Sequence, residues 1–148
     1  WNADGSGFLA NPASSSRRPA VRFLDADGRR VGELPNAGWL ADDGLGSFSP
    51  SGGRLVTFCS QDDTTPMACL YDVASRKQIG SVRFTYRSSR IDDSLLGWYD
   101  EESLISDVSL PDGVGYGTAV VGLDGTITQP LLRKEGVAIS AWFVGAVT

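Results

Sequence analysis

The stretch that decides the fold is Phe48-Ser-Pro-Ser-Gly-Gly-Arg-Leu55, in which an aromatic residue is followed by a turn-forming segment and then by the start of an apolar strand. A weaker copy, Trp1-Asn-Ala-Asp-Gly-Ser-Gly-Phe8, lies 47 positions earlier, with Trp1 in the place of Phe48. Sequence periods of roughly 20 to 50 residues are typical of folds that stack one repeated unit on the next. This repeat therefore sets the architecture that we expect.

Further landmarks keep the same interval along the chain. Three apolar pairs recur at steps of 47 and 50 residues: Phe23-Leu24, Leu70-Tyr71 and Val120-Val121. Three turn residues follow them at the same steps: Gly28, Ser75 and Gly125. We therefore predict a single structural segment over residues 1–148 that consists of three approximate repeats: 1–47, 48–97 and 98–148.

Each repeat has room for four short strands joined by turns. The expected strands of the first repeat are residues 7–11, 20–26, 30–35 and 39–40; those of the second are 54–60, 67–73, 77–86 and 94–98; those of the third are 103–109, 117–123, 126–132 and 137–144. Eighteen glycines and seven prolines are spread along the chain, which favours many short strands and turns. The predicted class is all-β, because four antiparallel strands every 45 to 50 residues or so are typical of a propeller blade.

The segments that carry the repeat resemble known propeller blades. Phe48 to Leu55 is similar to the F-S-P-D-G-x-x-L segment that opens blades in bacterial WD40-like and TolB-like repeat proteins. Leu70-Tyr71-Asp72-Val73 resembles the strand and turn of WD repeats, with Tyr-Asp in place of Trp-Asp. The chain has no histidine, so the buried-histidine tetrad of strict WD repeats cannot form. No functional residue is carried over, because these families share a scaffold rather than a site.

Three blades do not close a ring, since closed propellers have about four to eight. The resemblance therefore implies a partial propeller, or one that is completed by oligomerisation. Its two apolar end faces would need a cover, which either further blades in a longer parent chain or a homo-oligomer with six blades would supply. The start at Trp1, without a methionine or a signal-like apolar segment, leads us to expect a piece of a longer protein.

The composition excludes several functional classes. With no histidine and only two cysteines, histidine-based triads and Cys/His zinc sites cannot form. A net charge of −5 argues against nucleic acid as a partner, because phosphate neutralisation needs a surplus of Lys and Arg. No apolar run approaches the length of about 18 residues that a membrane span needs, so we expect no membrane insertion by this segment. We predict no enzymatic activity, no cofactor and no metal.

Acidic and aromatic groups leave a carbohydrate-active alternative open. Three acidic groups could supply the two carboxylates of a glycosidase: Asp62-Asp63, Asp92-Asp93 and Asp100-Glu101-Glu102. Solvated turns are the simpler interpretation of all three groups, because Asp favours turns. Four tryptophans could stack on sugars: Trp1, Trp39, Trp98 and Trp142. Packing between blades is the simpler interpretation, because Trp1 and Trp98 hold the same repeat position.

The segment Asp25-Ala-Asp27-Gly28 resembles the start of a calcium loop but lacks the remaining ligands, and we expect a hairpin turn there.

One segment interleaves basic and aromatic side chains. In Val82-Arg-Phe-Thr-Tyr-Arg87, alternation places Val82 and Tyr86 on one strand face and Arg83 and Arg87 on the other. Together with Arg90 these residues form the candidate ligand-binding set: Arg83, Tyr86, Arg87 and Arg90. An ordinary half-buried strand is the alternative interpretation.

The two cysteines predict a disulfide and a compartment. If Phe58 lies opposite Leu70 and Leu55 opposite Val73, then Cys59 lies directly opposite Cys69 in the same hairpin, within reach of a bond. Disulfides persist in oxidising compartments. A Cys59–Cys69 bond therefore predicts an extracytoplasmic protein, either secreted or anchored to a membrane.

The expected function is that of a non-catalytic binding or scaffolding domain of an exported or membrane-anchored bacterial protein. Its propeller loops would meet a protein or cell-envelope ligand. The alternative is a carbohydrate-active propeller fragment, similar to a lectin or a glycosidase, that uses aromatics and paired carboxylates. A scaffold should bury its tryptophans between blades, whereas a lectin or glycosidase should expose them near carboxylates.

Overall fold

A computed structural model of the chain describes residues 5–41, 45–59, 67–83, 95–109, 115–130 and 134–135. These residues form three antiparallel sheets and no α-helix, and they do not close into a barrel. No helix in this part of the chain is long and apolar enough to cross a membrane. The class is therefore all-β, as the sequence predicted.

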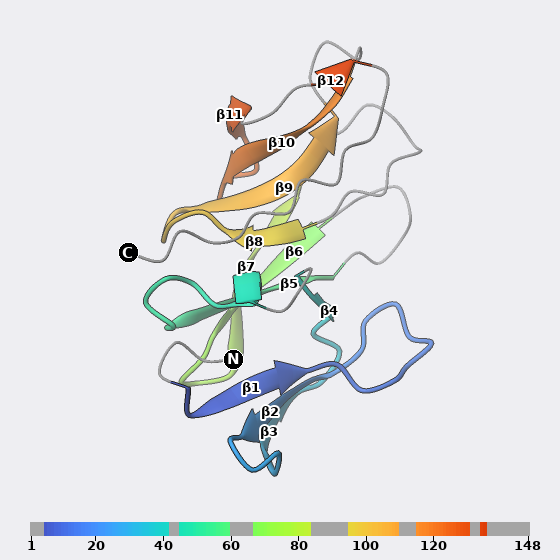
Figure 1. The fold of residues 1–148 in the computed structure, drawn as a ribbon, viewed down its shortest axis with the longest axis vertical. Helices are drawn as coiled ribbons and strands as arrows, with labels where there is room; N and C mark the ends of the chain where they lie inside the picture. Colours follow the sequence, from blue (N-terminus) through green and yellow to red (C-terminus); the bar gives the residue numbers. More distant parts are fainter. Residues whose placement is uncertain are drawn as a thin grey trace.

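The three sheets follow one another in chain order. The first sheet contains β1 (Gly7–Ala10), β2 (Val21–Asp25) and β3 (Arg30–Leu34). The middle sheet contains β4 (Trp39–Leu40), β5 (Arg54–Phe58), β6 (Met67–Asp72) and β7 (Lys77–Arg83). The last sheet contains β8 (Leu95–Trp98), β9 (Ser103–Ser109), β10 (Gly115–Gly122) and β11 (Ile127–Pro130), with β12 (Lys134–Glu135) also paired to β10. A 3-10 turn, η1 (Leu45–Ser47), follows β4. The sheets succeed one another along the long axis of the molecule (Figure 1).

The backbone repeats at the interval that the sequence shows. The turns β2–β3, β6–β7 and β10–β11 each contain one residue with positive φ, namely Gly28 at 78°, Arg76 at 56° and Gly125 at 86°. Ser75, the turn residue that the sequence repeat indicated, lies in the β6–β7 turn directly before Arg76. Gly5 and Gly52, which are 47 positions apart, also share a positive φ of 70° and 72°. These two glycines, which hold the same position in the two copies of the opening motif, therefore share the left-handed backbone conformation.

A β-bulge marks the same place in every sheet. The pairing register shifts between Phe23 and Leu24 in the first sheet, between Leu70 and Tyr71 in the middle sheet, and between Val120 and Val121 in the last. These are the three apolar pairs that recur in the sequence. A bulge inserts one extra residue and increases the local twist, so the sequence landmark corresponds to a shared bend in the three sheets.

Two strands belong to different sheets than their repeats suggested. The sequence grouped Trp39-Leu40 with the first repeat and residues 94–98 with the second. In the structure β4 pairs with β5 and β8 pairs with β9, so each joins the sheet that follows it. The physical reason is that a short strand has the same local propensity for either sheet, so tertiary context decides which edge it joins.

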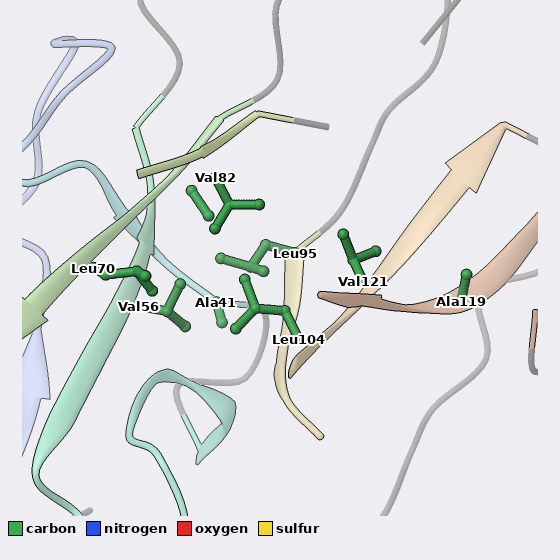
Figure 2. Packing of buried hydrophobic residues seen from close by; sticks show 9 residues of the cluster. Ala41, Val56, Leu70, Val82, Leu95, Leu104, Ala119 and Val121 are labelled. Carbon is green, nitrogen blue, oxygen red and sulfur yellow. The ribbon is translucent and has the colours of Figure 1, made fainter. Parts of the chain in front are cut away.

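The middle sheet packs on both of its faces. One face contacts the first sheet in a cluster of buried side chains: Val21, Phe23, Leu34, Ala37, Leu55, Cys59, Cys69 and Tyr71. The other face contacts the last sheet, as Figure 2 shows, in a second cluster: Ala41, Val56, Ala68, Leu70, Val82, Leu95, Leu104, Ala119 and Val121. Within β5, Leu55 and Val56 therefore face opposite neighbours, as the alternation of side chains along a strand requires.

Candidate functional site

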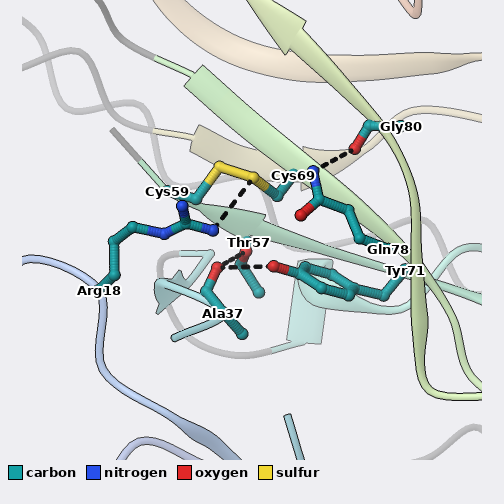
Figure 3. Close-up of a disulfide and its surroundings, with 8 residues drawn as sticks. All are labelled: Arg18, Ala37, Thr57, Cys59, Cys69, Tyr71, Gln78 and Gly80. Atoms are coloured by element: carbon teal, nitrogen blue, oxygen red, sulfur yellow. Dashed lines mark hydrogen bonds between the residues drawn. A yellow bond between two sulfur atoms is a disulfide. The ribbon is translucent and has the colours of Figure 1, made fainter. Parts of the chain in front are cut away.

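The disulfide is the predicted site feature that the structure confirms. Cys59 and Cys69 are bonded, their Cα atoms are 5.8 Å apart, and both residues are fully buried. They lie on the face of the middle sheet that contacts the first sheet (Figure 3). A buried disulfide of this kind is a structural cross-link rather than a reactive thiol pair.

The register that led to this prediction is wrong by two residues. Cys69 lies opposite Thr57, and Leu55 lies opposite Tyr71; the Cys59 backbone N–H donates to Met67 O at 2.8 Å. The two cysteines are therefore diagonal neighbours rather than direct partners. Strand twist brings one diagonal close, and a slip of two residues leaves every side chain on its predicted face.

Arg18, from the connection between β1 and β2, covers the disulfide. Its guanidinium Nη2 lies 3.8 Å from Cys69 Sγ, as Figure 3 shows. Its Nε is buried and has no hydrogen-bond partner among the described residues. Next to it, the carbonyl oxygen of Ala37 accepts hydrogen bonds from Thr57 Oγ1 at 2.6 Å and from the Tyr71 hydroxyl at 3.2 Å. This cluster fixes the link between the first two sheets and leaves both cysteines out of contact with solvent.

Only one member of the predicted ligand-binding set lies within the described residues. Arg83 is the last residue of β7, and it is exposed. Tyr86, Arg87 and Arg90 fall outside the residues that the structure describes, so their arrangement around Arg83 stays a prediction.

The described acidic triplet makes structural contacts between sheets. Glu101 Oε1 accepts a hydrogen bond from the Ser51 backbone N–H at 2.6 Å, and this bond lowers the pKa of the Glu101 carboxyl. Arg54 Nη1 donates to the Glu101 carbonyl at 2.8 Å and lies 3.7 Å from Glu102 Oε1. Asp100 Oδ1 accepts the Glu102 backbone N–H at 2.8 Å. The triplet therefore joins the last sheet to the turn before β5. The other two acidic pairs, at positions 62–63 and 92–93, lie outside the described residues.

The remaining turn carboxylates are bonded to their own turns. Asp25 Oδ1 accepts the backbone N–H groups of Asp27 and Arg29, which confirms a hairpin turn where a calcium loop was the alternative. Hydrogen bonds from the side chain and backbone N–H of Ser75 lower the pKa of Asp72. Among the described residues there is no group of three acidic or cysteine side chains arranged for a metal ion.

The two described tryptophans differ in their surroundings. Trp98 is partly buried against the cluster between the middle and last sheets, and its Nε1 donates to Ser47 O at 3.1 Å. This is the packing that the sequence predicted for its repeat position. Trp39 is 40% exposed and pairs with Phe58 across the ladder. Trp1 and Trp142 lie outside the described residues.

Arg76 makes a contact between sheets that sequence reasoning missed. Its guanidinium lies 5.4 Å from the centre of the Phe23 ring, and its Nη2 donates to Val31 O at 3.1 Å. A Cβ atom built on Gly32 would meet this guanidinium at 2.4 Å, so the glycine leaves room for the arginine. No local sequence pattern indicates this contact, because Arg76 and the residues that it contacts are more than 40 positions apart in the chain.

Comparisons with known proteins bear on the stacked-sheet arrangement. A solved structure shares this fold. It is described as "Crystal structure of the eukaryotic initiation factor", and it aligns with 91% of this chain at a TM-score of 0.52 and 17% identity. The chain spans 30% of the length of that structure. No family model and no curated protein matches the chain. At this level of identity the likeness concerns the fold alone.

Proposed function

We propose that this chain is a run of propeller blades that serves as a non-catalytic binding or scaffolding domain of an exported or membrane-anchored bacterial protein. The observation that carries the proposal is the regular stack of sheets, each with a positive-φ residue in the corresponding turn and a bulge at the corresponding place in its strands. Contacts such as Arg76 on Phe23 and Arg54 on Glu101 tie each sheet to the next. A rigid stack of this kind presents its connecting loops to partners.

The buried disulfide supports an extracytoplasmic location. Reducing compartments keep thiols free, so a cross-link formed by the two cysteines of the chain is compatible with export. Carboxylates occupied in turns and sheet junctions, as Glu101 and Asp72 are, favour a binding role over glycoside hydrolysis, which needs two carboxylates that face a substrate.

The ligand would be a protein or a cell-envelope component that contacts Arg83, Tyr86, Arg87 and Arg90. Arg83 is exposed at the start of this segment. Arginine and tyrosine are the side chains that most often dominate binding interfaces. Exposed Trp39 is the observation that favours the carbohydrate-active alternative.

The test compares binding of the purified chain to bacterial cell-envelope fractions. We expect saturable binding, and we expect Arg87→Ser with Arg90→Ser to weaken it by about ten-fold or more without changing Tm. The matched control, Arg29→Ser with Lys77→Ser, removes the same charge from exposed turn and strand positions and should bind like wild type. Equal binding by all three proteins would contradict the proposal. Release of reducing sugar, or loss of oligosaccharide binding in Trp39→Ala, would support the alternative.

A further inference from the structure

Arg18 carries a positive charge that has no anionic partner among the described residues. Its side chain is half-buried, and its Nε is buried without a hydrogen-bond partner. Within the described part of the chain, the guanidinium makes one polar contact, from Nη2 to Cys69 Sγ at 3.8 Å, which Figure 3 draws as a dashed line. Sulfur is a weak acceptor, so the disulfide satisfies this cation poorly.

The cluster around the disulfide offers no other charge in the part of the chain that the structure describes. The side chains that pack there are apolar or sulfur-containing, apart from Tyr71. The Tyr71 hydroxyl donates to the carbonyl oxygen of Ala37 at 3.2 Å. An opposite charge within about 4 to 6 Å favours the ionised form of a titratable group, and apolar surroundings screen such an interaction little. Arg18 is therefore the group that would act on an anion at Cys69.

We propose that Arg18 makes the Cys59–Cys69 disulfide a redox-sensitive link, because it stabilises the Cys69 thiolate that reduction of the bond leaves. In the oxidised chain the guanidinium faces a neutral sulfur. In the reduced chain it faces an anion, to which its N–H groups donate charge-assisted hydrogen bonds. A disulfide whose reduced form is stabilised in this way is a stronger oxidant than an ordinary structural disulfide.

The reaction is thiol–disulfide exchange with a dithiol reductant. The dithiol supplies two electrons, the bond between the two sulfur atoms breaks, and the dithiol becomes a disulfide. Of the two protons that the dithiol loses, one stays on Cys59 as a thiol and one passes to solvent, which leaves Cys69 as the thiolate. Both cysteines are fully buried, so burial limits the rate of attack, whereas Arg18 acts on the equilibrium. The inference does not depend on the ligand-binding role proposed above.

A redox titration of the whole chain tests the equilibrium. The chain is equilibrated with mixtures of reduced and oxidised dithiothreitol, from both the oxidised and the reduced side, and free thiols are counted by alkylation and intact mass. At mildly alkaline pH, Arg18→Gln should lower the equilibrium constant for reduction about ten-fold or more, which corresponds to about 30 mV or more for a two-electron couple.

Two matched variants separate charge from packing. Arg18→Lys keeps the positive charge and should restore most of the loss, and Arg29→Gln, which removes the same charge from an exposed turn, should titrate like wild type. Circular dichroism should show that the reduced wild-type chain is folded. An equilibrium constant that Arg18→Gln leaves unchanged, an Arg18→Lys chain that behaves like Arg18→Gln, or a reduced wild-type chain that is unfolded would each overturn the proposal.

Single-thiol chains give a second readout that a merely structural role of Arg18 would not move. Cys59→Ala and Cys69→Ala each lose the disulfide and keep one thiol. The thiolate absorbance in the ultraviolet should appear at lower pH for Cys69 than for Cys59, and adding Arg18→Gln should move the Cys69 transition to higher pH. Identical transitions for the two thiols, or a Cys69 transition that Arg18→Gln does not move, would refute the inference.

Discussion

At the scale of single residues, arginine side chains connect one sheet to the next. Arg18 covers the buried disulfide, Arg76 stacks on Phe23, and Arg54 bonds to Glu101. Each guanidinium offers several donors in a fixed plane, so one side chain can bond to a backbone carbonyl and still pack on an apolar group. The junctions between sheets are therefore partly polar at their edges and apolar at their centres.

Removing the disulfide should lower stability measurably. Cys59→Ala with Cys69→Ala opens a loop with a sequence separation of 10, and we expect a loss of about 2 to 3 kcal/mol. For a domain of this size the Tm should fall by roughly 4 to 12 °C. Thermal unfolding with and without reductant measures the loss, and the intact mass after alkylation under non-reducing denaturation should show no modified thiol in the wild-type chain. Two alkylated cysteines, or an unchanged Tm in the variant, would contradict this account.

At the scale of elements, the β2–β3 and β10–β11 turns share a conformation but not their surroundings. Gly28 and Gly125 have positive φ and donate matching turn hydrogen bonds, to Asp25 O and Gly122 O respectively. A Cβ atom on Gly28 would meet nothing within 4 Å, whereas one on Gly125 would lie 2.5 Å from the carbonyl oxygen of Arg83. The β10–β11 turn therefore contacts the middle sheet, at the end of β7.

Substituting alanine at each of these two glycines separates the free-energy cost of disturbing the contact between sheets from the cost of the backbone conformation. Gly28→Ala should lose about 1 to 2 kcal/mol, the cost of a left-handed residue with a Cβ atom. Gly125→Ala carries the same backbone cost and should lose roughly 1 to 3 kcal/mol more, because Arg83 or the turn must move. Denaturant unfolding measures both. Equal losses would show that the β10–β11 turn does not pack on the end of β7.

At the scale of the whole molecule, the middle sheet supports both of its neighbours. Leu55 and Leu104 hold corresponding places in β5 and β9, and both are fully buried. Leu55 belongs to the cluster with the first sheet, and Leu104 to the cluster with the last sheet. In stacked-repeat proteins, stability is approximately a sum over units and the interfaces between neighbours.

Two matched substitutions should therefore loosen different ends of the stack. Leu55→Ala and Leu104→Ala should each cost about 2 to 5 kcal/mol. Hydrogen exchange followed by mass spectrometry should show faster exchange in β2 for Leu55→Ala, and faster exchange in β9 and β10 for Leu104→Ala. Uniform loss of protection in both variants would indicate one cooperative core instead of two interfaces.

The sequence by itself determined the parts of the fold that depend on local pattern. Alternation and turn residues predicted the strands of the middle sheet to within a few residues. The recurrence of Phe23, Leu70 and Val120 predicted the repeat, and in the structure these residues lie at the shared bulge. The bond between Cys59 and Cys69 was also predictable, because side-chain parity assigns both to one face whichever of the two registers holds.

Tertiary structure alone decided what depends on neighbouring sheets. In the structure β4 and β8 pair in the sheets that follow them, and the register of β5 with β6 differs by two residues from the expected one. Arg18 contacts the disulfide and Arg76 contacts the Phe23 ring. Local propensity is the same for either sheet and either register, so it cannot choose between them. The stacking of the sheets decides which strand edges are open and which side chains distant in sequence come into contact. That stacking is set by the burial of both faces of the middle sheet.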